Sequence, residues 1–327
     1  MKIPGRYLSL PYGVKLRGLS GCRWTIAFCL LMAIVSPAQT LNTLVSFAGV
    51  KGSSPQSSLV QGADGAFYGT TILGGNNNCV SGCGTVFKVT SLGALTPLYI
   101  FCRQANCPDG NSPAAGLLLA SDGNFYGTTS GDDPSDPGNG SFGTVFKMSP
   151  GGSLTTLHDF MTGCGITCPN GATLAGGLVQ GSDGNFYGTT EYQGIINCIQ
   201  GCGTIFKITP AGSLSTLHSF SGADGGHPVA GLVQGTDGNF YGTTSAGGSS
   251  ANCNGGCGTV FKMSPSGSLI WTYSFKQTVD GAAPVAALVQ STDGNFYGTT
   301  SGGLFGKGTV FKITPGGSLT TLHNFNG

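Results

Sequence analysis

The chain of 327 residues contains 59 glycines, 39% apolar residues and only 8% charged residues. This composition excludes a charged disordered chain, and the absence of a Gly-X-Y period excludes collagen. Five of the 14 cations lie in the first 38 residues, so the remaining nine, set against 13 acidic residues, leave a net charge of −4 that argues against nucleic acid or an anionic membrane as a partner.

Residues 1–38 are predicted to be a secretory signal peptide. Five basic residues precede an apolar run at 25–35, and small residues stand at Ser36 and Ala38, immediately before Gln39. The run is too short to cross a bilayer. We therefore expect cleavage after Ala38 and a secreted or cell-envelope protein with no membrane span after cleavage.

The rest of the chain is a tandem repeat. Residues 40–47 resemble the last strand of a repeat, and a phrase in which one residue separates Asp-Gly from Phe-Tyr-Gly-Thr-Thr then occurs five times. We expect a single repeat domain over 39–327, with an extra strand at 40–47 and units at about 51–101, 102–160, 161–220, 221–275 and 276–327. The aromatic pairs of the phrase are Phe67/Tyr68, Phe125/Tyr126, Phe186/Tyr187, Phe240/Tyr241 and Phe296/Tyr297.

Each repeat has the pattern of four short strands. In the third, strands are predicted at 175–182, 185–190, 203–209 and 213–220, separated by Asp-Gly and Pro-x-Gly turns. The adjacent Phe and Tyr point to opposite faces of a sheet, so both faces must be covered. The pattern predicts an all-β protein, a β-propeller of about five four-stranded antiparallel blades with the extra N-terminal strand.

The repeat also resembles a known family. Gly-Leu-Val-Gln-Gly-Ser-Asp-Gly-Asn-Phe-Tyr-Gly-Thr-Thr at 177–190, with Gly-Thr-Ile-Phe-Lys-Ile-Thr-Pro at 203–210, is similar to the GloVer tandem repeat of exported bacterial proteins. The resemblance covers about 40–327 and implies β-propeller-like repeats and export, without an established activity. Its members often carry a C-terminal surface-sorting segment, whereas this chain ends at Asn326-Gly327, so free secretion is the expectation.

The two ends of each sheet differ in sequence. In an antiparallel meander, the short repeated turns share one end, and the loops between the second and third strands share the other end with the links between blades. These loops, at 72–83, 130–142, 191–202 and 245–257, all differ. We hypothesise a monomeric, non-catalytic protein that binds an extracellular glycan or envelope protein through the loop end. Unconstrained drift of loop sequence would give the same variation, and a structural or adhesive surface component is an alternative.

Ten cysteines remain after export, all at the loop end, in five local pairs. An even number in an exported chain predicts disulfides. Zinc would need four thiolates or added histidine, and free thiols or pairing between loops also stay open. The pairs are Cys79/Cys83, Cys102/Cys107, Cys164/Cys168, Cys198/Cys202 and Cys253/Cys257.

Ionisable residues that recur at the same place in several repeats are interpreted as structural, because a catalytic group is needed only once. His227 does not recur. It lies in a link, where a solvated loop residue is expected, but its titration range would also permit a role as general base or ligand. Glu191 and Asp159 are the candidate carboxylate pair for the alternative of a propeller-type lyase or glycoside hydrolase. The recurring sets are the hairpin aspartates, the link aspartates Asp109, Asp224 and Asp280, and the histidines His158, His218 and His323.

One loop offers oxygen ligands. Asp132, Asp133 and Asp136, together with Asn139, are candidate Ca²⁺ ligands, although the segment lacks the alternation of acids and glycine found in calcium loops, which favours a solvated loop. Apart from this calcium, no cofactor is expected.

Overall fold

The computed structural model describes residues 42–327, except 77, 80, 105–106, 132–141, 161–169, 193–201, 304–305 and 327. A compact unit begins at Leu44 and continues to Gly327. Among the described residues, no helix is long and apolar enough to cross a membrane. The predictions that lie outside the described residues are the signal peptide, the calcium ligands Asp132, Asp133, Asp136 and Asn139, and the cysteines Cys164, Cys168 and Cys198.

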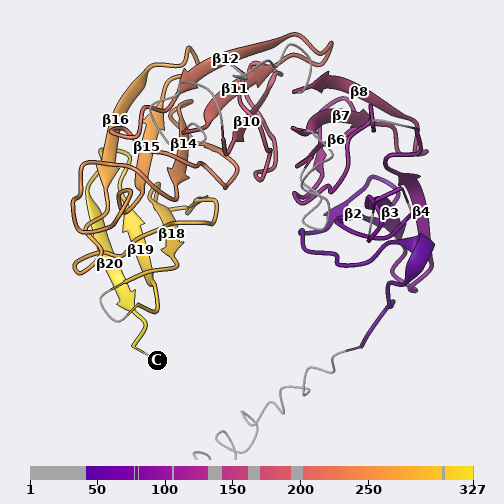
Figure 1. Ribbon diagram of the computed structural model, residues 1–327, viewed down its shortest axis with the longest axis horizontal. Coiled ribbons are helices and arrows are strands. Elements are labelled where there is room, and N and C mark those ends of the chain that lie inside the picture. Colours follow the sequence, from indigo (N-terminus) through magenta and orange to yellow (C-terminus); the bar gives the residue numbers. More distant parts are fainter. Residues whose placement is uncertain are drawn as a thin grey trace, which may run out of the picture. The chain divides into compact units, whose positions relative to one another are not determined.

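Five four-stranded antiparallel sheets follow one another along the chain, each with its strands in chain order (Figure 1). The sheets are β1 (Val60–Gln61), β2 (Phe67–Thr71), β3 (Thr85–Val89) and β4 (Leu95–Ile100); β5 (Leu118–Leu119), β6 (Phe125–Thr129), β7 (Thr144–Met148) and β8 (Leu154–Asp159); β9 (Val179–Gln180), β10 (Phe186–Thr190), β11 (Thr204–Ile208) and β12 (Leu214–Ser219); β13 (Val233–Gln234), β14 (Phe240–Thr244), β15 (Thr259–Met263) and β16 (Leu269–Ser274); β17 (Val289–Gln290), β18 (Phe296–Thr300), β19 (Thr309–Ile313) and β20 (Leu319–Asn324).

The first strand of each sheet is shorter than the sequence predicts. In the third repeat only Val179–Gln180 pairs with β10, not the whole of 175–182. The preceding segment bonds to another sheet instead, because Thr128 Oγ1 of β6 donates a hydrogen bond to the Gly176 carbonyl at 3.2 Å. The same threonine in β10, Thr189, bonds the Ala230 carbonyl ahead of β13 at 3.1 Å. Contact between sheets therefore replaces pairing within the sheet.

The strand register confirms the two ends of each sheet. Thr71 at the end of β2 pairs with Thr85 at the start of β3, and Thr85 pairs with Ile100 at the end of β4. The loop after β2 and the link after β4 therefore leave from the same end of the sheet. We call this the loop end, and the opposite end, which carries the Asp-Gly and Pro-x-Gly turns, the turn end.

The hydrophobic core lies between successive sheets, in four clusters. Each phrase tyrosine packs on the phrase phenylalanine of the next sheet, with ring centroids 3.9–4.3 Å apart. A second phenylalanine, which follows the fourth strand, packs on the third strand of the next sheet; Phe101 and Phe146 are an example, at 5.3 Å. Both faces of the inner sheets are thus covered, as the paired aromatics predict. The stacked pairs are Tyr68/Phe125, Tyr126/Phe186, Tyr187/Phe240 and Tyr241/Phe296.

The segment before the first sheet packs like a fourth strand without being paired as one. Residues 42–47, the described part of the predicted extra strand, form no ladder with a neighbouring strand. Phe47 nevertheless contacts Phe87 of β3 with ring centroids 4.7 Å apart. The turn glycine Gly93 lies against the Leu44 carbonyl, just as Gly152 lies against that of Leu98 in β4.

The repeated hairpin aspartates are turn residues. In the third sheet, Asp183 accepts a backbone hydrogen bond from Asn185 at 3.1 Å and the Tyr187 hydroxyl at 2.9 Å, and it pairs with Lys207 Nζ at 2.8 Å. The lysine also lies over the Tyr187 ring, 5.7 Å from its centroid. The same arrangement recurs in the first, second and fourth sheets, so the aspartates of these four sheets hold the hairpin turn.

Candidate binding site at the loop end

One backbone arrangement recurs at the loop end of all five sheets. In each link a non-glycine residue adopts a left-handed conformation, with φ between 51° and 59°. Its carbonyl accepts a hydrogen bond from the residue that follows the second strand; His227, for example, accepts from Ser245 at 3.0 Å. Such conformations cost about 1–3 kcal/mol each and are frequent at functional sites. The five left-handed residues are Ser54, Ser112, Thr173, His227 and Ala283.

His227 therefore occupies a repeated backbone position, although its residue type does not recur. Glu191 is the residue that follows the second strand in the third sheet, and its N–H donates to the carbonyl of the left-handed Thr173 at 2.8 Å. The backbone at both positions is the same in every sheet while the side chain changes. This is how a scaffold presents variable contacts.

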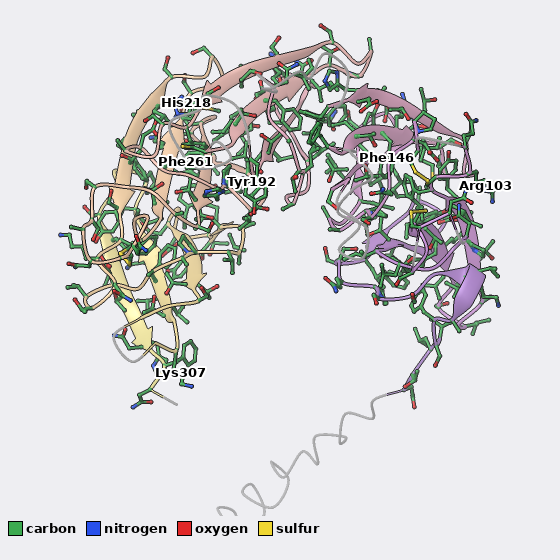
Figure 2. All side chains as sticks on the ribbon, in the orientation of Figure 1. Arg103, Phe146, Tyr192, His218, Phe261 and Lys307 are labelled. Carbon is green, nitrogen blue, oxygen red and sulfur yellow. A yellow bond between two sulfur atoms is a disulfide. The ribbon has the colours of Figure 1, made fainter. Side chains whose placement is uncertain are left out.

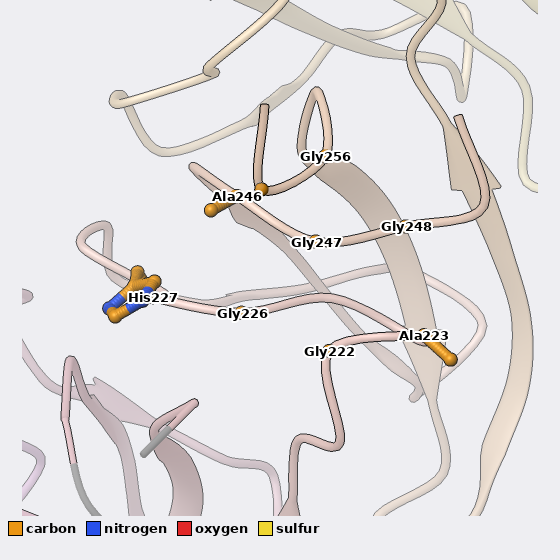
Figure 3. Close-up of a pocket in the computed structure, with 9 residues that line it drawn as sticks. Gly222, Ala223, Gly226, His227, Ala246, Gly247, Gly248 and Gly256 are labelled. Atoms are coloured by element: carbon orange, nitrogen blue, oxygen red, sulfur yellow. The ribbon is translucent and has the colours of Figure 1, made fainter. Parts of the chain in front are cut away.

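A hollow of about 480 Å³ opens at the loop end of the fourth sheet (Figure 3). Its walls are the link after β12 and the loop after β14, which are joined by hydrogen bonds such as Gly226 N–H to the Ala246 carbonyl at 2.9 Å. The disulfide Cys253–Cys257 closes the loop behind it. The lining residues are Gly222, Ala223, Gly226, His227, Ala246, Gly247, Gly248, Gly255 and Gly256.

One position in the wall of this hollow requires glycine, because two backbone segments approach closely there. Gly247 has φ +75°, and a Cβ there would come within 2.5 Å of the Gly225 backbone. Gly226 is different, because the nearest atom to a Cβ at this position would be 3.8 Å away and its φ is not left-handed. Gly226 lines the hollow, and a Cβ there would therefore make only ordinary van der Waals contacts.

An equivalent hollow of about 310 Å³ lies at the loop end of the first sheet. Ser53 takes the place of Gly226, since it bridges to Leu73 as Gly226 bridges to Ala246. The first hollow thus has the same backbone and more polar side chains than the fourth. Its lining residues are Gly49, Val50, Ser53, Gly74, Gly75, Asn76, Ser81 and Gly82.

His227 meets an aromatic ring from the preceding sheet. Its imidazole lies edge-on to the Tyr192 ring, with centroids 5.1 Å apart, and both side chains are half-buried. Tyr192 directly follows Glu191, so a carboxylate, a phenol and an imidazole come from the loop ends of the third and fourth sheets. Figure 2 labels Tyr192 at this boundary.

The candidate pair Glu191 and Asp159 comes from different kinds of position. Asp159 ends β8, the edge strand of the second sheet, and Glu191 follows β10, which lies between two other strands of the third sheet. Both are at the loop end. Their role as an acid–base pair stays a prediction.

The described cysteines form disulfides within the predicted local pairs. Cys79–Cys83, Cys102–Cys107 and Cys253–Cys257 are bonded, and Cys202 is also in a disulfide, while its predicted partner Cys198 lies outside the described residues. Zinc would need thiolates, and these sulfur atoms are in disulfides. Disulfides persist in oxidising compartments, which indicates an extracellular location.

The link aspartates and fourth-strand histidines are structural where they are paired. Asp224 accepts hydrogen bonds from the Ser221 backbone at 2.8 Å and bonds His218 Nε2 at 2.9 Å. Burial raises the pKa of Asp224, but the hydrogen bonds from His218 and Ser221 outweigh it and lower the pKa to about 2. Asp109 and Asp280 likewise accept from the backbone at the start of their links.

His158 differs from His218. Its Nε2 is buried and has no hydrogen-bond partner among the described residues, and burial lowers the pKa of the imidazole. The residue at the link-aspartate position is Asn170, which accepts instead from Thr216 of β12 at 3.1 Å. His158 therefore packs on Phe160 as a neutral ring.

Comparison with known proteins identifies the repeat. The sequence profile of the Gloeobacter/Verrucomicrobia repeat family matches residues 30–200 and 138–327, two overlapping regions. The chain belongs to this family. A search of curated protein sequences gives no match for this repeat protein.

Solved structures with a similar fold include three lyase structures. Virginiamycin B lyase from Staphylococcus aureus has 15% identity and a TM-score of 0.53, covering 84% of this chain and 71% of its own. A streptogramin B lyase has 16% identity with the same TM-score and coverage. A catalytically inactive variant of the S. aureus lyase, determined with quinupristin, has 15% identity and again the same TM-score and coverage. At these identities the likeness shows the fold alone, so this family member is a repeat β-propeller.

Sequence reasoning missed the left-handed position and the hollow. A usable signal exists, because four of the five left-handed residues directly precede proline. Aligning the repeats on these prolines would have placed His227 opposite Ser54 and Ser112. The hollow has no comparable signal, since it depends on the approach of two separate glycine segments.

Proposed function

We propose that this repeat propeller is secreted through its signal peptide, is non-catalytic, and binds an extracellular glycan at the loop end of its first and fourth sheets. The observation that carries the proposal is the hollow built twice on one backbone arrangement, at the end where the repeats differ in sequence. A scaffold that keeps its backbone and changes its side chains at one end suits recognition.

The size and chemistry of the hollows favour a glycan over an envelope protein. Volumes of about 480 and 310 Å³ match small-ligand pockets, whereas a stable protein interface buries about 1,200–2,000 Å². Ser53 and Asn76 in the first hollow can bond sugar hydroxyls. At the hollow of the fourth sheet, the ring of Tyr192 lies beside His227 and offers a flat aromatic surface next to a polar group.

The test fills the fourth hollow and measures binding. Residues 39–327 are screened on a glycan array, and affinity for the selected glycan is measured by calorimetry for the wild type, Gly226→Leu and Gly226→Leu with Ser53→Leu. We expect Gly226→Leu to remove the binding that belongs to the fourth hollow and the double variant to weaken total binding at least tenfold.

The matched control is Gly151→Leu at the turn end. Gly151 also has no left-handed φ, and a Cβ there would come no closer than 3.8 Å to another atom. The Gly151→Leu variant should leave the affinity for the glycan unchanged. Unchanged affinity in the double variant, or capture of an envelope protein with no glycan bound, would overturn the proposal.

An enzyme is the second candidate, favoured by the meeting of Tyr192 and His227 beside Glu191. A lyase or glycoside hydrolase would use Glu191, with Asp159, as acid and base. Incubation with quinupristin and with oligosaccharides, followed by mass spectrometry, tests for turnover. If turnover is found and Glu191→Gln retains it, this assignment is wrong.

A third hypothesis is a structural or adhesive surface component. A monomeric protein found free in the culture medium would contradict it.

A further inference from the structure

Four cysteines gather at the loop end of the first sheet. Cys79–Cys83 lies in the loop after β2, and Cys102–Cys107 lies in the link after β4. The Sγ atoms of Cys79, Cys102 and Cys107 are all within 4.8 Å of one another, and all four cysteines are buried. Figure 2 labels Arg103, the residue that follows Cys102 in this link.

Hydrogen bonds hold the loop against the link. Asn76 Nδ2 donates to the carbonyls of Phe101 at 2.7 Å and Cys102 at 3.0 Å, and Asn78 Nδ2 donates to the Cys102 carbonyl at 2.7 Å. The closeness of the two disulfides is therefore built by specific contacts and does not depend on chance packing of the loop.

The fourth sheet supplies a natural comparison. Its loop carries Cys253–Cys257 with the same separation of four residues as Cys79–Cys83. Asn252 Nδ2 donates to the Lys276 carbonyl of the facing link at 3.2 Å. That link, residues 276–287, contains no cysteine. The fourth sheet thus offers the same loop disulfide opposite a link that lacks the second cystine.

The backbone marks Cys102–Cys107 as the strained partner. Cys102 has φ +55° and Cys107 has φ +43°, both left-handed. Ser221 and Lys276, which occupy the place of Cys102 in later links, are not left-handed. A non-glycine residue in this conformation carries a cost that rearrangement can release.

We propose that these four cysteines form a thiol–disulfide exchange site, in which Cys79 transfers the disulfide from within the link to a bridge between loop and link. A dithiol first reduces Cys79–Cys83 and is itself oxidised, leaving two thiols. The Cys79 thiol gives its proton to water, and the thiolate attacks Sγ of Cys102 or Cys107. The new bridge forms as the Cys102–Cys107 bond breaks, and the released thiolate takes up a proton.

The attack of Cys79 on the Cys102–Cys107 bond is an exchange, so this step needs no oxidant and leaves the number of disulfides in the protein unchanged. Because the Sγ atoms of Cys79, Cys102 and Cys107 lie within 4.8 Å of one another, the Cys79 thiolate meets the neighbouring cystine at a high effective concentration. The product ties the loop after β2 to the link after β4, two segments that the local disulfides leave unconnected.

Cys83→Ser tests this directly, because it leaves Cys79 as a free thiol beside an intact cystine. The purified variant is alkylated and digested with trypsin, which separates Cys79, Cys102 and Cys107 onto the peptides 52–88, 89–103 and 104–147. We expect most molecules to contain peptide 52–88 bridged to one of the other two, with the alkyl group on the remaining cysteine.

Cys257→Ser is the matched control, since it frees Cys253 opposite a link without cysteine. Cys253 should be alkylated in almost every molecule. A third variant, Cys83→Ser with Cys102→Ser and Cys107→Ser, should also leave Cys79 fully alkylated. Wild-type protein treated with less than one equivalent of dithiothreitol should yield the same cross-bridged peptides, which covers the case of a variant that folds poorly.

Two results would overturn the proposal. One is quantitative alkylation of Cys79 in Cys83→Ser with the 89–103 and 104–147 peptides still bridged. The other is bridging of Cys253 to a distant cysteine in Cys257→Ser, because it would show general scrambling rather than a local exchange site.

Discussion

At the residue scale, Asp183 shows why the repeated aspartates are present. Burial raises the pKa of this carboxyl, but hydrogen bonds from Lys207, Asn185 and Tyr187 outweigh burial and hold the pKa well below its usual value. A lowered pKa means that the unfolded chain takes up a proton before the folded one does. The stability that these contacts supply is therefore present above about pH 4 and is lost as the pH falls further.

We predict that Asp183→Asn lowers the free energy of unfolding by about 1 kcal/mol at pH 7, because both members of the ion pair are partly exposed. The difference from wild type should shrink as the pH falls from 4 to 2. Urea denaturation at several pH values measures it. Asp293→Asn is the control, since Asp293 has no ion pair among the described residues; an equal loss there at pH 7 would contradict the ion-pair explanation.

His158 is a base whose pKa, like that of Asp183, is lowered in the folded protein. Burial lowers the pKa of this imidazole, although Asp159 partly opposes the effect. The unfolded chain therefore binds the proton more readily, and stability should decrease as the pH falls below about 6.5.

We predict that His158→Phe reduces the loss of stability between pH 8 and pH 5.5. The aromatic ring keeps the contact with Phe160, and the buried nitrogen without a partner is removed. Thermal unfolding at the two pH values provides the measurement. His323→Phe, at an exposed position of β20, should keep the wild-type pH dependence; an unchanged dependence in His158→Phe would assign the loss to other groups.

At the scale of elements, the sheets depend on one another through the stacked aromatics. Tyr187 is fully buried against Phe240, with ring centroids 4.1 Å apart. Tyr297 has the same place in the last sheet but is only partly buried, and nearby Val289 is 67% exposed. The equivalent tyrosine should therefore contribute more to the free energy of unfolding in the third sheet than in the last.

We predict that Tyr187→Ala costs about 3–5 kcal/mol of stability and Tyr297→Ala about 1 kcal/mol or less. Both remove a hydroxyl bonded to the hairpin aspartate, so the difference reports the stack. Chemical denaturation of the two variants measures it. Equal losses would mean that the face of the last sheet is covered in solution.

The second, third and fourth strands were predictable because their signals are local. Phe186–Thr190 is preceded by an Asp-Gly turn, and Leu214–Ser219 by a Pro-x-Gly turn, each with the chemistry of its turn type. The first strand was predicted too long. The hydrogen bond from Thr128 to Gly176 comes from another repeat and cannot be read from a local pattern.

At the scale of the whole molecule, the N-terminal segment supplies to the first sheet what each sheet supplies to the next. Phe47 packs on Phe87 as Phe101 packs on Phe146. Phe325 has the corresponding place after β20 and is 46% exposed. The segment before the first sheet therefore belongs to the packed array.

We predict that Phe47→Ala destabilises the protein by about 2 kcal/mol or more, whereas Phe325→Ala changes the free energy of unfolding by less than about 0.5 kcal/mol. Hydrogen exchange should show the loss in Phe47→Ala concentrated in β3 and β4. A uniform or absent effect would show that residues 44–47 contribute little to the first sheet.

The disulfides also belong to this scale. If all five predicted pairs form, the mass of the intact protein should rise by about ten hydrogens on reduction, since each disulfide takes up two. Ten thiols that react with iodoacetamide before reduction would contradict the pairing and the oxidising compartment together.

The sequence by itself determined five repeated sheets, their turns and the two unlike ends of each sheet, because strand alternation and turn chemistry act over a few neighbouring residues. Only the tertiary structure decided that His227 meets Tyr192, that two glycine segments enclose a hollow, and that Cys79 lies beside Cys102–Cys107. These depend on contacts between loops and links that are distant in the chain, and such loops carry no periodic pattern to predict their approach.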